Sequence, residues 1–270
     1  AETPADIRLL LRDHGARCSA TILTTVLTTR RDWQRGGHVR PSLAYFANFY
    51  RSVLSVPGGG VRAVVLHDGL PANLTDEYAS PDGAISFVKA DLASVSADLG
   101  VNDIRFLLFR DQIAAHPEWD VVFTTDASDV VLRHNPCQLV AQASDKIYLG
   151  SEEGGIYNNS FLRRRFQDMG GRYLEWFEKL PDSHNPILNA GLIGGTRAKM
   201  LELTSRIAEV LADPGLAARR QRREVDVNMA ALNWVVFNRY APGDVVSGYP
   251  MHTPYKKYQR MREDVYFIHK

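Results

Sequence analysis

The stretch WDVVFTTDASDVVLRHNP, residues 119–136, joins two apolar runs through a short polar turn. The first run, VVF, is typical of a buried strand, because short β-branched and aromatic runs favour the interior of a sheet. Asp126 and Asp129 follow, three residues apart, and two carboxylates in one turn repel each other unless a cation or donors lie between them. Spacing alone favours a turn whose carboxylates accept backbone N–H bonds, whereas the position at a strand tip favours Mg²⁺ or Mn²⁺.

The sequence on both sides of this stretch predicts an α/β fold. Apolar strand-like runs alternate with amphipathic stretches, a pattern typical of a mostly parallel sheet covered by helices. The expected strands are residues 20–28, 61–69, 84–91, 120–126, 145–154 and 186–195. The expected helices are residues 41–55, 104–116, 196–213 and 224–240, with Asn102 or Asp103 capping the second.

Ligands of such sheets bind at the carboxyl ends of the strands. Polar residues stand at three of these expected ends: Thr28 to Arg30, Asp126 to Asp129, and Glu152 with Glu153. We therefore expect the functional site at this edge of the sheet.

The composition is that of an ordinary globular protein. The 270 residues are 45% hydrophobic and 23% charged, enough for one large domain or two small ones. The net charge of +1 gives no global attraction to nucleic acid, so the basic runs at 163–165, 218–223 and 255–262 are interpreted as solvated faces. No apolar run approaches the roughly 18–20 residues that span a bilayer. The opening residues lack a signal-peptide pattern, and loss of an N-terminal anchor by processing stays an alternative.

Cys18 and Cys137 are the only cysteines, too few for a disulfide scaffold or a cysteine-based zinc site. We interpret them as buried thiols in a reducing compartment, with one disulfide in an oxidising lumen as the alternative. A cytoplasmic location is therefore favoured, and the Golgi lumen is the alternative.

Several common enzyme signatures are absent from the sequence. There is no G-x-G-x-x-G after the first strand, no G-x-x-x-x-G-K-[ST], no G-x-S-x-G and no H-E-x-x-H. Dehydrogenase, P-loop, α/β-hydrolase and zinc-protease interpretations therefore lose support.

Three later motifs carry further candidates. LNAGLIGG, residues 188–195, is glycine-rich and allows a backbone to approach a ligand closely, although a tight strand-to-helix turn also explains it. EVDVN places Asp226 at an expected helix start, where an acid also stabilises the helix dipole. His269 and Lys270 follow the apolar run VYFI and suit a metal ligand and a phosphate partner, or a solvated tail.

In this order, the motifs resemble GT-A glycosyltransferases, most closely the glycosyltransferase domains of procollagen lysyl hydroxylases and related collagen sugar transferases. There the usual D-x-D motif is spaced D-x-x-D, as in FTTDASDVVL, and phrases similar to KIYLGSEEG and LNAGLIGG follow. The resemblance covers roughly residues 20–270. It implies a single Rossmann-like GT-A domain with a mixed, mostly parallel sheet flanked by helices, with a nucleotide-binding half at about 1–135 and a donor-sugar and acceptor half at about 136–270.

The resemblance also implies a role for each candidate. Asp126, Asp129 and His269 would bind Mn²⁺ (or Mg²⁺) against the diphosphate of a nucleotide sugar. The expected donor contacts are Thr28, Thr29, Arg30, Arg105, Asp126, Asn189, Gly191 and Lys270. Asp226 and Glu152 are the expected catalytic carboxylates, which stabilise an oxocarbenium-like state or deprotonate the acceptor hydroxyl.

The sequence therefore predicts a metal-dependent glycosyltransferase that moves a sugar from a nucleoside diphosphate sugar, most simply UDP-linked, to a hydroxyl of a glycan or glycoprotein. A catalytically silent domain that binds a nucleotide or glycan is one alternative, and a sugar nucleotidyltransferase is another. Ala127 and Ser128 stand where the collagen-type phrase carries an aromatic residue, so contacts to the base must come from elsewhere.

Overall fold

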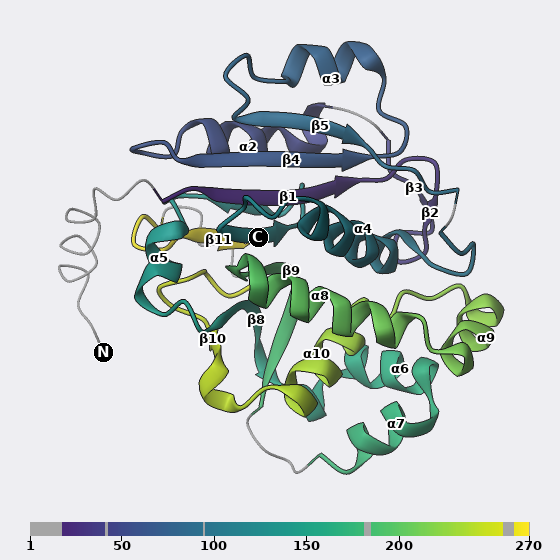
Figure 1. The fold of residues 1–270 in the computed structure, drawn as a ribbon. Coiled ribbons are helices and arrows are strands. Elements are labelled where there is room, and N and C mark those ends of the chain that lie inside the picture. The colour runs from purple at the N-terminus through teal and green to yellow at the C-terminus, as the bar shows by residue number, and fades with distance from the viewer. Residues whose placement is uncertain (1–17, 41–42, 94, 181–184, 256–261, 270) are drawn as a thin grey trace.

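The computed structural model describes residues 18–40, 43–93, 95–180, 185–255 and 262–269. Within these residues, seven strands form one sheet in the order β10-β8-β9-β6-β1-β4-β5 (Figure 1). Their bounds are β1 Ala20–Val26, β4 Val61–His67, β5 Ile85–Lys89, β6 Val121–Thr125, β8 Ile147–Gly155, β9 Pro186–Thr196 and β10 Val245–Ser247. β9 runs antiparallel to β6 and β8, and the remaining neighbours are parallel. The predicted α/β class with a mixed, mostly parallel sheet is confirmed.

Helices cover both faces of this sheet. Those of the described chain are α2 Leu43–Leu54, α3 Ala72–Tyr78, α4 Val101–Ala115, α5 Cys137–Gln142, α6 Ser160–Met169, α7 Gly171–Glu178, α8 Arg197–Leu211, α9 Pro214–Arg223 and α10 Asn228–Arg239. Figure 1 shows α4 and α8 side by side along the sheet, and α6 packs against α7, α9 and α10. Short pairs lie outside the main sheet: β2 Arg31–Asp32 with β3 Gly37–His38, and β7 Val130–Leu132 with β11 Phe267–His269.

The buried strands contribute side chains to two hydrophobic clusters, one on each face of the sheet. Successive side chains of a strand point to opposite faces, so Val122 packs in the cluster of α4, α8 and α10, while Phe123 packs in the cluster of α2 and α5. Burial of each large apolar side chain contributes about 1.5–3 kcal/mol. Phe123 also explains one glycine of LNAGLIGG, because a side chain at Gly194, its partner in the register, would overlap the ring.

Two helix boundaries differ from the expectation. α4 begins at Val101 with Gly100 as its cap, so Asn102 and Asp103 lie inside the first turn and the predicted caps are wrong. α10 begins at Asn228 instead of 224, because Glu224 has a left-handed backbone (φ 49°) and ends α9. α3, α5, α6, α7 and α9 have no counterpart among the predicted helices, and each is a short element of six to ten residues.

The basic runs are only partly solvated faces. Arg220 of α9 is 2% exposed; it pairs with Asp98 at 2.9 Å and donates to the Leu211 carbonyl at 2.7 Å, so the prediction is wrong for this residue. Arg164 and Arg222 are exposed, as expected. The run at 255–262 lies mostly outside the described residues.

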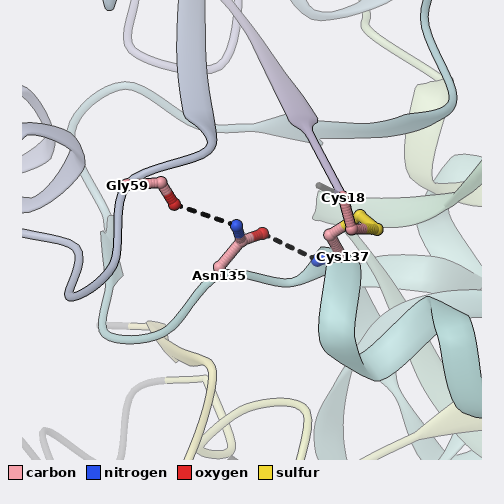
Figure 2. Close-up of a disulfide and its surroundings, with 4 residues drawn as sticks. All are labelled: Cys18, Gly59, Asn135 and Cys137. Carbon is pink, nitrogen blue, oxygen red and sulfur yellow. Dashed lines mark hydrogen bonds between the residues drawn. A yellow bond between two sulfur atoms is a disulfide. The ribbon is translucent and has the colours of Figure 1, made fainter. Parts of the chain in front are cut away.

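Cys18 and Cys137 form a disulfide, so the prediction of two free thiols is wrong and its alternative holds. The bond joins the segment before β1 to the start of α5, and the Cα atoms are 5.8 Å apart. Asn135 supports this junction by donating to the Gly59 carbonyl and accepting the Cys137 N–H bond, each at 3.0 Å (Figure 2). Disulfides persist mainly in oxidising compartments, and both predicted locations of this chain stay predictions.

Candidate functional site

The antiparallel strand β9 brings its own start to the carboxyl end of β6. Thr125 at the end of β6 pairs with Leu192, and the next residue, Asp126, donates its N–H to the Gly191 carbonyl at 2.9 Å. Asn189, two residues earlier on β9, accepts the Gly191 N–H bond at 2.7 Å through Oδ1. The chain therefore places the predicted residues Asp126, Asn189 and Gly191 together.

Three polar side-chain atoms converge on the position that a Cβ atom of residue 191 would occupy. A Cβ at this position would sit 2.5 Å from Asp126 Oδ2, 3.0 Å from Asn189 Oδ1 and 3.0 Å from His269 Nε2. These atoms come from β9, the β6–β7 turn and β11, which are far apart in sequence. Because glycine has no side chain, a small space remains among these atoms, which we call the cradle. Each of the three atoms can bind a cation or accept a hydrogen bond.

Arg105 fixes one side of this cradle. It points from α4 into the site, is 7% exposed, forms an ion pair with Asp126 Oδ1 and donates to the Ala190 carbonyl at 3.1 Å. Burial alone would raise the pKa of Asp126, but the charge of Arg105, together with His269, holds it below the usual value. Asp126 is therefore ionised at neutral pH, as a cation ligand must be.

His269 enters the site through the register of a short strand. β11 pairs antiparallel with β7, and His269 lies opposite Val130. The residue is 1% exposed, and neither ring nitrogen has a hydrogen-bond partner within the described structure. Burial lowers the pKa of His269 to about 4 against the opposing charge of Asp126, so the ring is neutral at pH 7. Buried polar atoms without partners are rare, and a neutral imidazole is the form that binds metal.

The predicted metal set is assembled only in part. Asp126 and His269 converge, whereas no group of three His, Cys, Asp or Glu side chains among the described residues is arranged to hold a metal. Asp129 lines the adjoining pocket beside Asp126 but does not complete the set, and Arg105 occupies the other oxygen of Asp126. Asp126 Oδ2 and His269 Nε2 thus lie near the same point beside Gly191, and a cation bound there stays a prediction.

Adjoining pockets open over this cradle. The smaller has a volume of about 110 Å³ and is lined by Asp126 to Asp129 and by residues of the β2–β3 hairpin. The larger, of about 280 Å³, includes Glu152, Asn189 and Gly191. Both share the lining residues Gln34, Asn102, Arg105, Asp126 and Tyr255. Together the two volumes fall within the roughly 300–1,000 Å³ typical of small-molecule sites.

The larger pocket is rich in amides. Glu152 accepts a hydrogen bond from Asn189 Nδ2 at 2.7 Å, which orients both side chains at its wall. Side chains of Gln34, Asn102 and Asn228 also line it. Amides and a carboxylate are the groups that recognise hydroxyls.

Thr28 to Arg30 follow β1 at the expected edge but turn away from these pockets. The two threonines donate their N–H and hydroxyl groups to Asp68 after β4, at 2.6–3.1 Å. Arg30 donates to the carbonyls of Leu92 and Val95. None of the three is among the described residues that line either pocket, and their donor contacts stay a prediction.

Asp226 lies one layer behind the larger pocket. It is 3% exposed, and its Oδ2 accepts a hydrogen bond from Asn102 Nδ2 at 3.1 Å, while Asn102 lines both pockets. Lys270 is outside the described residues.

Sequence reasoning did not assign Asn102, Gln34 and Tyr255 to the site, although all three line both pockets. Asn102 and Asp103 had a visible signal as polar residues at the start of an apolar helix, which we assigned to capping. Gln34 and Tyr255 lay in segments without periodicity. The Tyr255 ring stands 4.7 Å from that of His269, between centroids, which places an aromatic surface at the shared wall of the pockets.

Comparison with known proteins adds no relative: no family model matches the chain, and no curated protein matches it in sequence. None of the helices in the described parts of the chain is long and apolar enough to cross a membrane.

Proposed function

We propose that this chain is a metal-dependent glycosyltransferase of GT-A type, which moves a sugar from a nucleoside diphosphate sugar, most simply UDP-linked, to a hydroxyl of a glycan or glycoprotein. The observation that carries the proposal is the convergence of Asp126, Asn189 and His269 over Gly191, below the adjoining pockets. The mixed, mostly parallel sheet supports it, because the resemblance implies that architecture.

The site can bind and orient a diphosphate. Arg105 presents a buried guanidinium beside Asp126, and a buried guanidinium favours phosphate oxygens strongly. A divalent ion between Asp126 and His269 would supply the charge that stabilises a leaving diphosphate. The ring of His269, neutral at pH 7, leaves Nε2 open for that ion.

The larger pocket suits the sugar and the acceptor hydroxyl. Glu152 is the predicted catalytic carboxylate that lines it, and Asn189 holds one of its oxygens in place. In the proposed reaction the acceptor hydroxyl forms a bond to the anomeric carbon, while the bond from that carbon to the diphosphate oxygen breaks. The nucleoside diphosphate leaves with the electron pair, and the hydroxyl proton passes to a carboxylate. Asp226 acts on this pocket through Asn102.

Binding of nucleotide sugars with Mn²⁺ tests the proposal. A ligand at one hundred times its dissociation constant stabilises the fold by about 2.7 kcal/mol, which a thermal-shift measurement resolves. We expect this stabilisation for the unsubstituted chain, its loss in Asp126→Asn, and its retention in Asp76→Asn, an exposed site on α3. Release of nucleoside diphosphate should follow the same pattern.

The alternatives predict different results. A silent binding domain would be stabilised by the nucleotide sugar without releasing the diphosphate. A nucleotidyltransferase would release pyrophosphate from a nucleoside triphosphate and a sugar phosphate. No stabilisation by any nucleotide sugar, with or without Mn²⁺, would contradict the proposal.

A further inference from the structure

Two acids are buried together where α4 meets the start of α10. Asp103 is 0% exposed and Asp226 is 3% exposed. Each keeps one carboxyl oxygen, Oδ2 of Asp103 and Oδ1 of Asp226, buried without a hydrogen-bond partner in the described structure. Buried carboxylates normally have partners for both oxygens, so a pair with two unmatched oxygens beside a pocket needs an explanation.

The hydrogen bonds of the two acids are reciprocal. Asp103 Oδ1 accepts the backbone N–H bonds of Val227 and Asn228, at 2.9 and 2.7 Å. Asp226 Oδ2 accepts a bond from Asn102, the neighbour of Asp103. Each acid thus holds the segment that carries the other. Asp103 also replaces the missing side-chain cap of α10.

The charges around the pair do not neutralise both acids. Arg220 of α9 faces Asp103, and Arg105 of α4 and Arg165 of α6 face Asp226. These arginines already pair with Asp98, Asp126 and Asp168, respectively. Asp32 of β2 adds a further negative charge on the side of Asp226.

We infer that Asp103 and Asp226 hold one proton between them at neutral pH, and that Asp103 is a positioning residue of the site. The proton belongs on Oδ2 of Asp103, because its Oδ1 already accepts two N–H bonds. Asp226 then remains the charged member that orients the Asn102 amide, and Asp103 sets the start of α10 from which Asn228 reaches the larger pocket.

The surroundings support this assignment. Burial, with the charge of Asp226, raises the pKa of Asp103 to about 8, and burial also raises that of Asp226. The unfolded chain loses this proton near pH 4, whereas the folded chain keeps it until about pH 8. The folded state therefore binds one more proton in this window, so its stability falls as pH rises.

The pH dependence of unfolding tests the pair without reference to activity. Because the folded state binds one more proton between pH 5 and 8, the unfolding equilibrium constant should increase by up to about tenfold for each unit that the pH rises. We expect Asp103→Asn to remove this component, because an amide oxygen still accepts both N–H bonds but carries no titrating proton. Asp111→Asn, exposed on the same helix, should retain it. An unchanged slope in Asp103→Asn would overturn the inference.

A second measurement needs no variant. At pH 6 exposed carboxyls are ionised, so infrared spectroscopy of the unsubstituted protein should show a protonated carboxyl band that disappears by about pH 9. Absence of that band would also overturn the inference, including in the case that Asp103→Asn does not fold.

The role in positioning rests on the proposed function, and activity separates the two ideas. Asp103→Asn should shift the pH profile of donor turnover, and Asp103→Leu, which cannot accept the N–H bonds, should lose turnover. If turnover is absent although the band and the slope are present, the pair holds and the proposed function fails. If turnover is present with the same pH profile in Asp103→Asn, the positioning role fails and the proposed function holds.

Discussion

Substitution of Gly191 by alanine should damage the site more than the fold. Ordinary contact begins at 3.4 Å, so the added Cβ would be too close to Asp126 Oδ2 by about 0.9 Å and to the Asn189 and His269 atoms by about 0.4 Å. The backbone cannot retreat, because Gly191 is held on one side through its N–H bond and on the other through its carbonyl. Overpacking of this kind costs about 1–3 kcal/mol.

The assay compares stability and ligand binding in the same variant. A loss of about 1–3 kcal/mol lowers the melting temperature by roughly 2–12 °C in a chain of this size. We further expect at least a tenfold loss in affinity for Mn²⁺ with nucleotide sugar, because Asp126 and His269 must separate to admit the methyl group. Gly243→Ala is the matched control, since nothing lies within 4 Å of its Cβ position.

One outcome would refute the reasoning directly. If Gly191→Ala binds Mn²⁺ and nucleotide sugar as tightly as Gly243→Ala does, the cradle is not the ligand site. A fall in melting temperature without loss of binding would leave only a packing role for this glycine.

Three further predictions concern stability. Arg220→Ala should cost about 1–3 kcal/mol in urea unfolding, because the mostly buried Asp98 loses its ion-pair partner and keeps only the hydroxyl of Ser96, whereas exposed Arg222→Ala should change stability by less than about 0.5 kcal/mol. Burial raises the pKa of Asp98, but Ser96 and Arg220 outweigh burial and hold that pKa below its usual value. The stability that Asp98 contributes is therefore present above about pH 4 and lost at lower pH, and Arg220→Ala should reduce that loss. Reduction of the disulfide, which links residues 119 apart, should lower the unfolding free energy by about 4–5 kcal/mol, and detection of two free thiols in the native, unreduced protein would contradict the bond.

The strand pattern was predictable because it depends on local composition. Runs such as VVFTT alternate between two buried faces, and β-branched residues at these positions leave few other structures open. The start of α10 was not predictable in the same way. Glu224 suits a helix by propensity, yet it adopts a left-handed conformation, and the cap of α10 comes from Asp103, which lies 124 residues before Val227.

The candidate site shows the same division between local and distant information. Asp126 and Gly191 were identifiable, since a carboxylate after a buried strand and a glycine within one are local signals. The disulfide and the burial of Arg220 were not, because both depend on a partner elsewhere in the chain. The sequence correctly predicted that Thr28 and Thr29 lie at this edge of the sheet. It did not predict that Asp68, which accepts their hydrogen bonds, lies beside them, because Asp68 follows another strand.

The register of β11 against β7 sets the position of His269 in the site. Side chains of a strand alternate between two sides, so His269 reaches Asp126 only while it stands opposite Val130. Inserting or deleting one residue next to β11 would turn the imidazole away and bring Ile268 toward the carboxylate. A shift of two residues would keep the imidazole on the inward side but would move it roughly 7 Å along β7, away from Asp126. Every shift of the register should therefore weaken a ligand contact that needs both side chains, and length variants of the segment before β11, assayed for Mn²⁺ binding, would measure that dependence.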